Sequence, residues 1–207
     1  MKIGIIVDGD AESQALKLLT QRIAISDAQI LDPLYANIQP KSAPGQIVKS
    51  VKPKLDILIA RQVSKIVVLI DREDQPECPS ELAQGIENAF RKLGHSNVHV
   101  AIKNRRFENW LISDTKVFKK LSARYKTTEA FISTVIPNKA DTVENATGLL
   151  NKICVGPEYH KRRDAAQITK HQDISEISKN SRSFRRFLRL LGHQDYETQS
   201  KKPSASK

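Results

Sequence analysis

The sequence predicts an α/β protein with an open, largely parallel sheet flanked by helices and a helical extension at its C-terminal end. Two observations carry this prediction. Strand-like and helix-like segments alternate through residue 103, the pattern of a parallel sheet with crossover helices, and the pattern is helical from residue 107 onward. We expect an α/β domain over residues 1–112, a basic helical extension packed on it over 113–192 and a flexible tail over 193–207.

Short apolar runs mark the strands. Residues 2–8, 65–71 and 98–103 are rich in β-branched side chains, as buried strands are. A weaker extended stretch at 30–38 is interrupted by Pro33, which is typical of an edge strand.

Helices are expected between and after these strands. Asp10 and Ser80 are predicted to cap the helices that follow the first strand and the strand at 65–71. Between them, residues 43–62 carry apolar side chains on one side, although Pro53 threatens a kink. In the second half, helical segments are predicted at residues 107–111, 117–125, 142–153, 163–171 and 181–191.

The positive charge is concentrated in the second half. Residues 1–100 contain 12 Lys and Arg and 12 Asp and Glu, whereas residues 101–207 contain 22 and 11, so the net charge of +11 lies entirely in the second half. This asymmetry indicates a polyanionic partner, and nucleic acid rather than a membrane. It is equally typical of an ordinary solvated basic surface.

Composition also bears on location. The longest apolar run, residues 66–70, is far short of the roughly 18 residues that a membrane helix needs. The N-terminus reaches an acid too soon for a secretory signal peptide, and Cys78 and Cys154 have no metal or redox spacing. We expect a cytoplasmic protein.

Two of the predicted strands end in acidic clusters, at residues 8–12 and 71–74. Ligands of open α/β sheets bind at the carboxyl ends of the strands, and Mg²⁺ prefers carboxylate oxygens. We therefore expect a site for one or two Mg²⁺ or Mn²⁺ ions that activate water in phosphodiester cleavage. Its predicted ligands are Asp8, Glu12, Asp71 and Glu73. The alternative is that the first cluster only stabilises a helix N-terminus.

These acidic segments resemble the Toprim fold of type II topoisomerases, primases, recombination-repair proteins and nucleases of the overcoming-lysogenization-defect class. Residues 7–12 look like the Glu-Gly-x-x-Glu motif of the nuclease branch, and residues 69–74 look like the Asp-x-Asp motif. Asp8 stands where the family has glutamate, and Glu73 stands at the second aspartate. Such departures would also fit a Toprim-like protein that binds without cutting.

The chain more closely resembles small bacterial Toprim-like proteins often encoded beside an ATPase. That resemblance includes residues 106–114, 159–161 and 181–187 and covers nearly the whole chain except the tail. It implies a nuclease in bacterial defence against phage or mobile DNA, with an ATPase partner that restrains or triggers the cut.

The resemblance also implies roles for three further residues. Glu108, together with Asp114, would complete the metal site, and Lys161 would stabilise charge developing on a phosphate. The alternatives are that Glu108 favours a helix start, that Asp114 caps the next helix and that Lys161 is a solvated loop lysine.

The final helix carries four arginines at i, i+3, i+4 and i+7 spacing: Arg182, Arg185, Arg186 and Arg189. This stripe could track a phosphate backbone or be an ordinary solvated face. The sequence therefore favours a metal-dependent nuclease acting on DNA or RNA. The alternative is a non-catalytic subunit that grips nucleic acid or a partner with its basic half.

Overall fold

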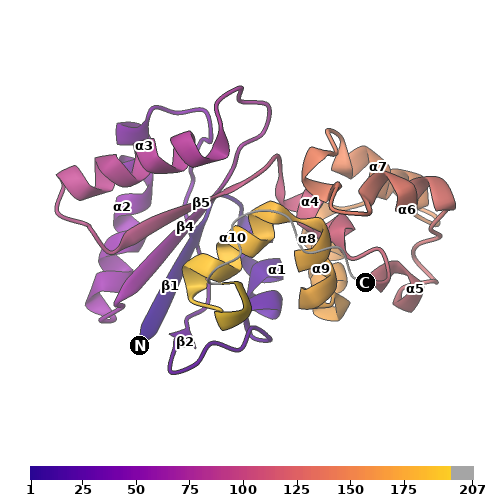
Figure 1. Ribbon diagram of the computed structural model, residues 1–207, viewed down its shortest axis with the longest axis horizontal. Coiled ribbons are helices and arrows are strands. Elements are labelled where there is room, and N and C mark those ends of the chain that lie inside the picture. The colour runs from indigo at the N-terminus through magenta and orange to yellow at the C-terminus, as the bar shows by residue number, and fades with distance from the viewer. Residues whose placement is uncertain (197–207) are drawn as a thin grey trace.

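A parallel sheet lies at the centre of the first half of the chain (Figure 1). The computed structural model describes residues 1–196. In this part of the chain the strands are β1 (Lys2–Val7), β2 (Gln29–Ile30), β3 (Leu34–Tyr35), β4 (Lys65–Asp71) and β5 (Val98–Lys103). Their order is β2-β1-β4-β5, with β3 also paired to β1, and every pairing is parallel. The predicted α/β class is confirmed.

Different helices cover the two faces of the sheet (Figure 1). On one face, α2 (Pro44–Ala60) and α3 (Pro79–Lys92) pack around alternate side chains of β4 such as Val68. On the other face, α1 (Asp10–Thr20) and helices of the second half pack around Val67. Because successive strand residues point to opposite faces, each central strand contributes to both cores.

The second half of the described chain is helical, as predicted. Its helices are α4 (Phe107–Ser113), α5 (Val117–Lys120), α6 (Glu129–Val135), α7 (Ala146–Ile153), α8 (Lys161–His171), α9 (Ile174–Asn180) and α10 (Arg182–Leu191). Short 3₁₀ turns lie at Ala140–Thr142 and Gln194–Tyr196. None of the helices within residues 1–196 has the length and apolar character needed to cross a membrane.

One apolar core runs from the sheet into the second half. The ring of Trp110 lies 5.0 Å from that of Phe184 and 5.4 Å from that of Phe187, centroid to centroid. Its indole N–H donates a hydrogen bond to Ser183 over 2.7 Å. Such aromatic pairs contribute about 0.5–1.5 kcal/mol each beyond the area they bury. Because Val67 of β4 belongs to the same buried cluster, the sheet and α10 share one core.

Several local predictions differ from the structure. Pro53 lies inside α2 without ending it, because it is on the solvent side, where water can bond the carbonyl it leaves free. Asp10 and Ser80 do not cap their helices, which begin after Gly9 and Cys78. Lys161 is not in a loop but is the first residue of α8.

The second half also holds helices that the sequence pattern did not predict. α6 and α9 were not expected, and the helix predicted over 117–125 ends at Lys120. Of the predicted tail, residues 194–196 form a turn, and residues 197–207 lie outside the described residues.

Candidate metal centre

Three carboxylates meet at the carboxyl ends of β1 and β4. Asp8 follows β1, Glu12 lies four residues later in the first turn of α1, and Asp71 is the last residue of β4. The two strands are neighbours, and Val7 lies opposite Leu69, so their ends coincide. One oxygen of each acid lies within 4.8 Å of the others. The structure therefore brings together three of the four predicted ligands.

A buried lysine lies among these acids. Lys103 ends β5 directly opposite Asp71, and its side chain is fully buried. Its Nζ lies 2.9 Å from Asp8 Oδ1, 2.5 Å from Glu12 Oε2 and 2.9 Å from Asp71 Oδ1. Sequence reasoning missed this residue, although a lysine that ends an apolar strand beside an acid-ended strand was a usable signal.

The electrostatics of the cluster follow from burial and from one cation facing three acids. Burial raises the pKa of Asp71 to about 6, even though Lys103 opposes the shift. Burial and the two neighbouring carboxylates raise the pKa of Glu12 well above its usual range. For Asp8 burial acts in the same direction, but Lys103 and the Asp71 N–H outweigh it and lower its pKa. That N–H donates to Asp8 Oδ2 over 2.7 Å.

These residues fit a divalent cation. The donor set is all carboxylate oxygen, which hard cations such as Mg²⁺, Mn²⁺ and Ca²⁺ prefer. Glu12 Oε1 is buried and accepts no hydrogen bond from the described residues. Lys103 can balance only one of three negative charges when all three acids are ionised. Asp8, Glu12 and Asp71 could therefore hold a metal ion.

The family model described as "Domain of unknown function (DUF4276)" matches residues 7–192. The chain belongs to the DUF4276 family. The matched span begins one residue before Asp8 and includes every candidate residue. No curated protein matches the chain, and no solved structure matches it.

Glu73 lies outside the acid cluster of this DUF4276 domain. The prediction assumed that the strand alternation continued past Asp71, which would place Asp71 and Glu73 on one face. Instead β4 ends at Asp71, and Glu73 adopts a left-handed backbone conformation with φ of 57°. Its carboxylate lies 3.9 Å from Lys41 Nζ.

Glu108 and Lys161 form a pair at the rim. Lys161 Nζ lies 3.4 Å from Glu108 Oε1, and the Tyr159 hydroxyl donates to the same oxygen over 3.4 Å. The Glu108 side chain is buried, whereas that of Lys161 is 43% exposed. The Lys161 charge also acts to lower the pKa of Asp71, so the ammonium lies close enough to influence the acid cluster.

Asp114 does not join the cluster. Its carboxylate accepts hydrogen bonds from the backbone N–H groups of Lys116 and Val117 at the start of α5 and of Asp173 at the start of α9. Asp114 therefore bonds the backbone at the start of the next helix, as the capping alternative expected, and is not a ligand of the metal site.

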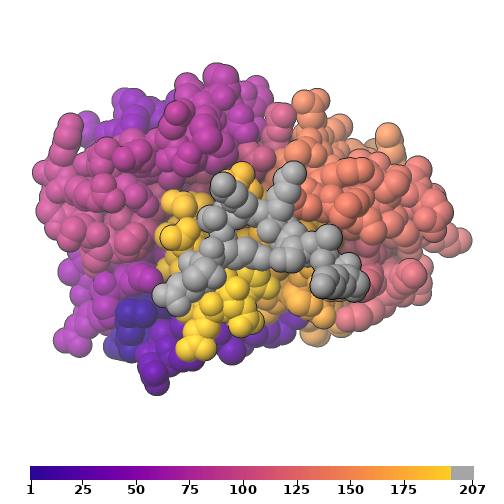
Figure 2. Space-filling model, viewed as in Figure 1, coloured from indigo at the N-terminus to yellow at the C-terminus, as the bar shows by residue number. Residues whose placement is uncertain are grey.

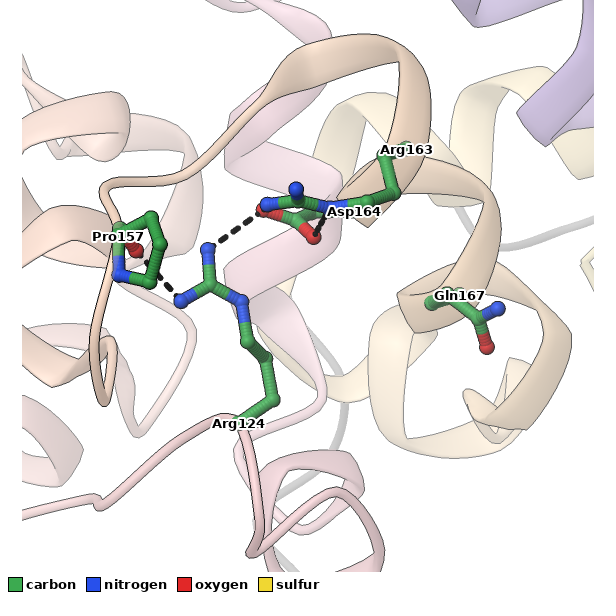
Figure 3. Close-up of a pocket in the computed structure, with 5 residues that line it drawn as sticks. All are labelled: Arg124, Pro157, Arg163, Asp164 and Gln167. Carbon is green, nitrogen blue, oxygen red and sulfur yellow. Dashed lines mark hydrogen bonds and ion pairs between the residues drawn. The ribbon is translucent and has the colours of Figure 1, made fainter.

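An ion-pair cluster fixes the start of α8, where Lys161 stands (Figure 3). Asp164 accepts hydrogen bonds from the guanidinium groups of Arg124 and Arg163 and from the His160 N–H, at 2.8–3.1 Å. Arg124 also donates to the Pro157 carbonyl. The cluster ties the preceding loop to α8 and so sets the position of Lys161.

The predicted arginine stripe on α10 is interrupted. Arg182, Arg186 and Arg189 are exposed and line a cleft of about 530 Å³. Arg185 is only 1% exposed, and it donates to the Ser178 carbonyl over 2.5 Å. Its side of α10 packs against the α9 end of the fold, so Arg185 is a structural residue rather than a surface contact.

Proposed function

We propose that the DUF4276 domain is a Toprim-like, metal-dependent nuclease that cleaves phosphodiester bonds in DNA or RNA. The observation that carries this proposal is the convergence of Asp8, Glu12 and Asp71 at the carboxyl ends of two adjacent parallel strands. This edge of an open α/β sheet is where ligands bind. The resemblance of residues 7–12 and 69–74 to the Toprim motifs adds support.

In this proposal each residue of the centre has a distinct role. Asp8, Glu12 and Asp71 hold Mg²⁺ or Mn²⁺, which when bound would activate a water molecule and stabilise the leaving oxygen. Lys103 contacts all three carboxylates and fixes their spacing. The exposed ammonium of Lys161 meets a non-bridging phosphate oxygen, and buried Glu108 acts as an accessory acid that orients it.

The cellular setting is proposed on the sequence alone. The net charge of +11 in residues 101–207 favours a nucleic-acid substrate. The resemblance to proteins encoded beside ATPases supports a role in cytoplasmic anti-phage defence with an ATPase partner. The sequence has no phosphate-binding loop of its own, so nucleotide hydrolysis would come from that partner.

One observation favours a second candidate function, a non-catalytic subunit that binds nucleic acid or a protein partner. Lys103 already places a cation among the three acids. A buried lysine that satisfies the carboxylates could make the cluster a structural element that needs no metal.

Two measurements distinguish these functions. Isothermal titration with Mn²⁺ tests whether the acids take up a metal ion, with Asp71→Asn as the matched variant. Cleavage is then assayed on plasmid DNA, tRNA and bulk RNA with Mg²⁺, with Mn²⁺ and with EDTA. We expect Mn²⁺ binding and EDTA-sensitive cleavage, both lost in Asp71→Asn. Absence of both from the folded parent protein would leave the non-catalytic function.

A further inference from the structure

The cleft beside α10 is separate from the acid cluster and is strongly basic. Arg182, Arg186 and Arg189 line one side, and Arg72, which follows β4, lines another. The N-terminus of α3 closes the cleft at Ser80, where the helix dipole adds partial positive charge. Figure 2 shows α10, in yellow, reaching the surface between the α2–α3 layer and the α5–α7 region.

Three of these arginines have no partner among residues 1–196. The side chains of Arg182, Arg186 and Arg189 make no hydrogen bond or ion pair with any residue of the described chain. The acid that lines the cleft, Asp141, already accepts hydrogen bonds from Ser181 and from the N–H and hydroxyl of Ser183 at 2.7–3.0 Å. Within residues 1–196 the positive charge of the cleft therefore has no acidic side chain free to balance it, and this favours an anionic ligand.

The fourth arginine is held in place. Arg72 donates from Nε to the Gln75 carbonyl over 2.9 Å and from Nη1 to Asn104 over 2.7 Å. Asn104 in turn donates to the Asp141 carbonyl over 3.1 Å. A planar guanidinium fixed by two bonds keeps its remaining N–H groups ready for bidentate contact with two oxygens of a phosphate.

The volume and the apolar lining of the cleft indicate a ligand larger than inorganic phosphate. Its volume of about 530 Å³ falls in the range of roughly 300–1,000 Å³ typical of small-molecule sites. Pro79 and the small exposed edge of the otherwise buried Ile102 add apolar surface beside the arginines. Apolar surface and guanidinium planes suit the sugar and base of a nucleotide, which a phosphate ion alone would leave uncovered.

The cleft and the acid cluster lie on either side of the ends of β4 and β5. Asp71 and Lys103 belong to the acid cluster, whereas the following residues, Arg72 and Asn104, line the cleft. Ile102 also lines the cleft, because it points to the face of β5 opposite Lys103. A nucleic-acid strand whose end occupied the cleft would therefore lie next to the acid cluster.

We propose that this cleft binds a nucleoside phosphate, with the phosphate on the arginines and the nucleoside over Ile102 and Pro79. The source is either a free mononucleotide or the 5′-phosphorylated end of a nucleic-acid strand. Only the strand-end form rests on the proposed nuclease function.

Binding is measured in EDTA, so that cleavage plays no part. Calorimetry compares adenosine monophosphate, adenosine and inorganic phosphate, and fluorescence anisotropy compares a single-stranded oligonucleotide with and without its 5′-phosphate. The test variant is Arg182→Gln, Arg186→Gln and Arg189→Gln together. The matched control, Lys119→Gln, Lys126→Gln and Lys152→Gln, removes the same charge from exposed positions outside the cleft. Thermal melting checks that both variants fold, and the single variant Arg186→Gln serves if the triple variant does not.

We expect adenosine monophosphate to bind more tightly than either adenosine or phosphate, and the cleft variant to lose at least about 100-fold in affinity, since charge-assisted hydrogen bonds are lost. If the 5′-phosphate strengthens oligonucleotide binding, the ligand of the cleft is a strand end. If the 5′-phosphate has no effect while adenosine monophosphate binds tightly, the ligand is a free nucleotide. Equal losses in the cleft and control variants, or phosphate binding as tightly as the nucleotide, would overturn the proposal. Nucleotide binding without any nuclease activity would refute the proposed function while leaving the cleft intact.

Discussion

Lys103→Met gives a direct test of the acid cluster, because it removes the buried cation and keeps an apolar side chain of similar length. Three carboxylates within 4.8 Å would then face one another without Lys103. Breaking a buried ion pair by removing one partner costs about 3–5 kcal/mol. In a chain of 207 residues, each kcal/mol shifts the melting temperature by roughly 2–4 °C, so we expect a fall of roughly 6–20 °C.

A divalent cation should reverse this loss if the cluster is a metal site. At a concentration 100 times the dissociation constant, a ligand that binds only the folded state adds about 2.7 kcal/mol, most of what the substitution removes. The assay is thermal melting of the parent and of Lys103→Met in EDTA, in Mg²⁺ and in Mn²⁺. Lys161→Met is the matched control, because that lysine is partly exposed and pairs with Glu108 over 3.4 Å rather than with the three clustered acids.

Two results would refute this reasoning. An unchanged melting temperature in EDTA would mean that Lys103 does not balance the acids. A destabilised variant that neither Mg²⁺ nor Mn²⁺ rescues would mean that the acids cannot exchange the lysine for a metal ion. A second substitution, Asp8→Asn in the Lys103→Met background, should restore part of the stability without metal, because Asp8 is the acid of the three whose pKa is lowered and whose charge therefore repels its neighbours.

Five further variants have expected outcomes. Asp71→Asn should abolish Mn²⁺-dependent cleavage without lowering the melting temperature, because it relieves repulsion among the acids. Glu73→Gln should leave the Mn²⁺ affinity unchanged in a titration, because Glu73 lies beside Lys41 and outside the acid cluster. Lys161→Gln should lower the cleavage rate while the melting temperature stays within a few degrees of the parent, and an equal rate would refute its role. Asp164→Asn should lower the melting temperature at pH 7, and by progressively less as the pH falls below about 4. Burial raises the pKa of the Asp164 carboxyl, but hydrogen bonds from Arg163 and Arg124 outweigh burial and hold the folded-state pKa below the unfolded value. The stability that ionised Asp164 contributes is therefore present above the unfolded pKa and lost in acid. The triple arginine variant of α10 should flatten the dependence of log affinity for duplex DNA on log salt by roughly two to three units, and an unchanged slope would show that these arginines do not meet phosphates.

The acid cluster could be predicted because it depends on rules that a sequence displays. Two apolar strands end in acids, parallel neighbours in an open sheet end at the same edge, and Glu12 lies one helical turn after Asp8. Glu73 could not be placed in this way, because the sequence pattern does not reveal that β4 stops at Asp71. A non-glycine residue with positive φ follows two positions later and ends the alternation.

Lys103 and Arg185 show what local patterns leave out. Lys103 meets the acids because the β4–β5 register sets it opposite Asp71. A one-residue slip of that register would turn the Lys103 side chain to the other face of the sheet, and the pattern of one strand alone does not fix its pairing with a neighbour. Arg185 falls at stripe spacing but is buried, because α10 packs on Trp110 and also on the end of α9, which covers more than one side of the helix. The helix α9 was itself too short and too polar to be predicted from its pattern.

The two proposed sites depend on each other through charge. Three ionised acids and one lysine leave a centre with a net negative charge, which repels a phosphodiester. A nuclease built on this centre needs both a metal ion among the acids and cations nearby to hold the strand, which Lys161 and the arginine cleft supply. A binding subunit needs only the cleft, with Lys103 serving as the permanent counter-ion of the acids. The Lys103→Met melts and the cleft titrations therefore report on separate requirements. Metal rescue without nucleotide binding would leave Lys161 as the proposed contact that holds the phosphate. Nucleotide binding without metal rescue would make the acid cluster a structural feature of a binding protein.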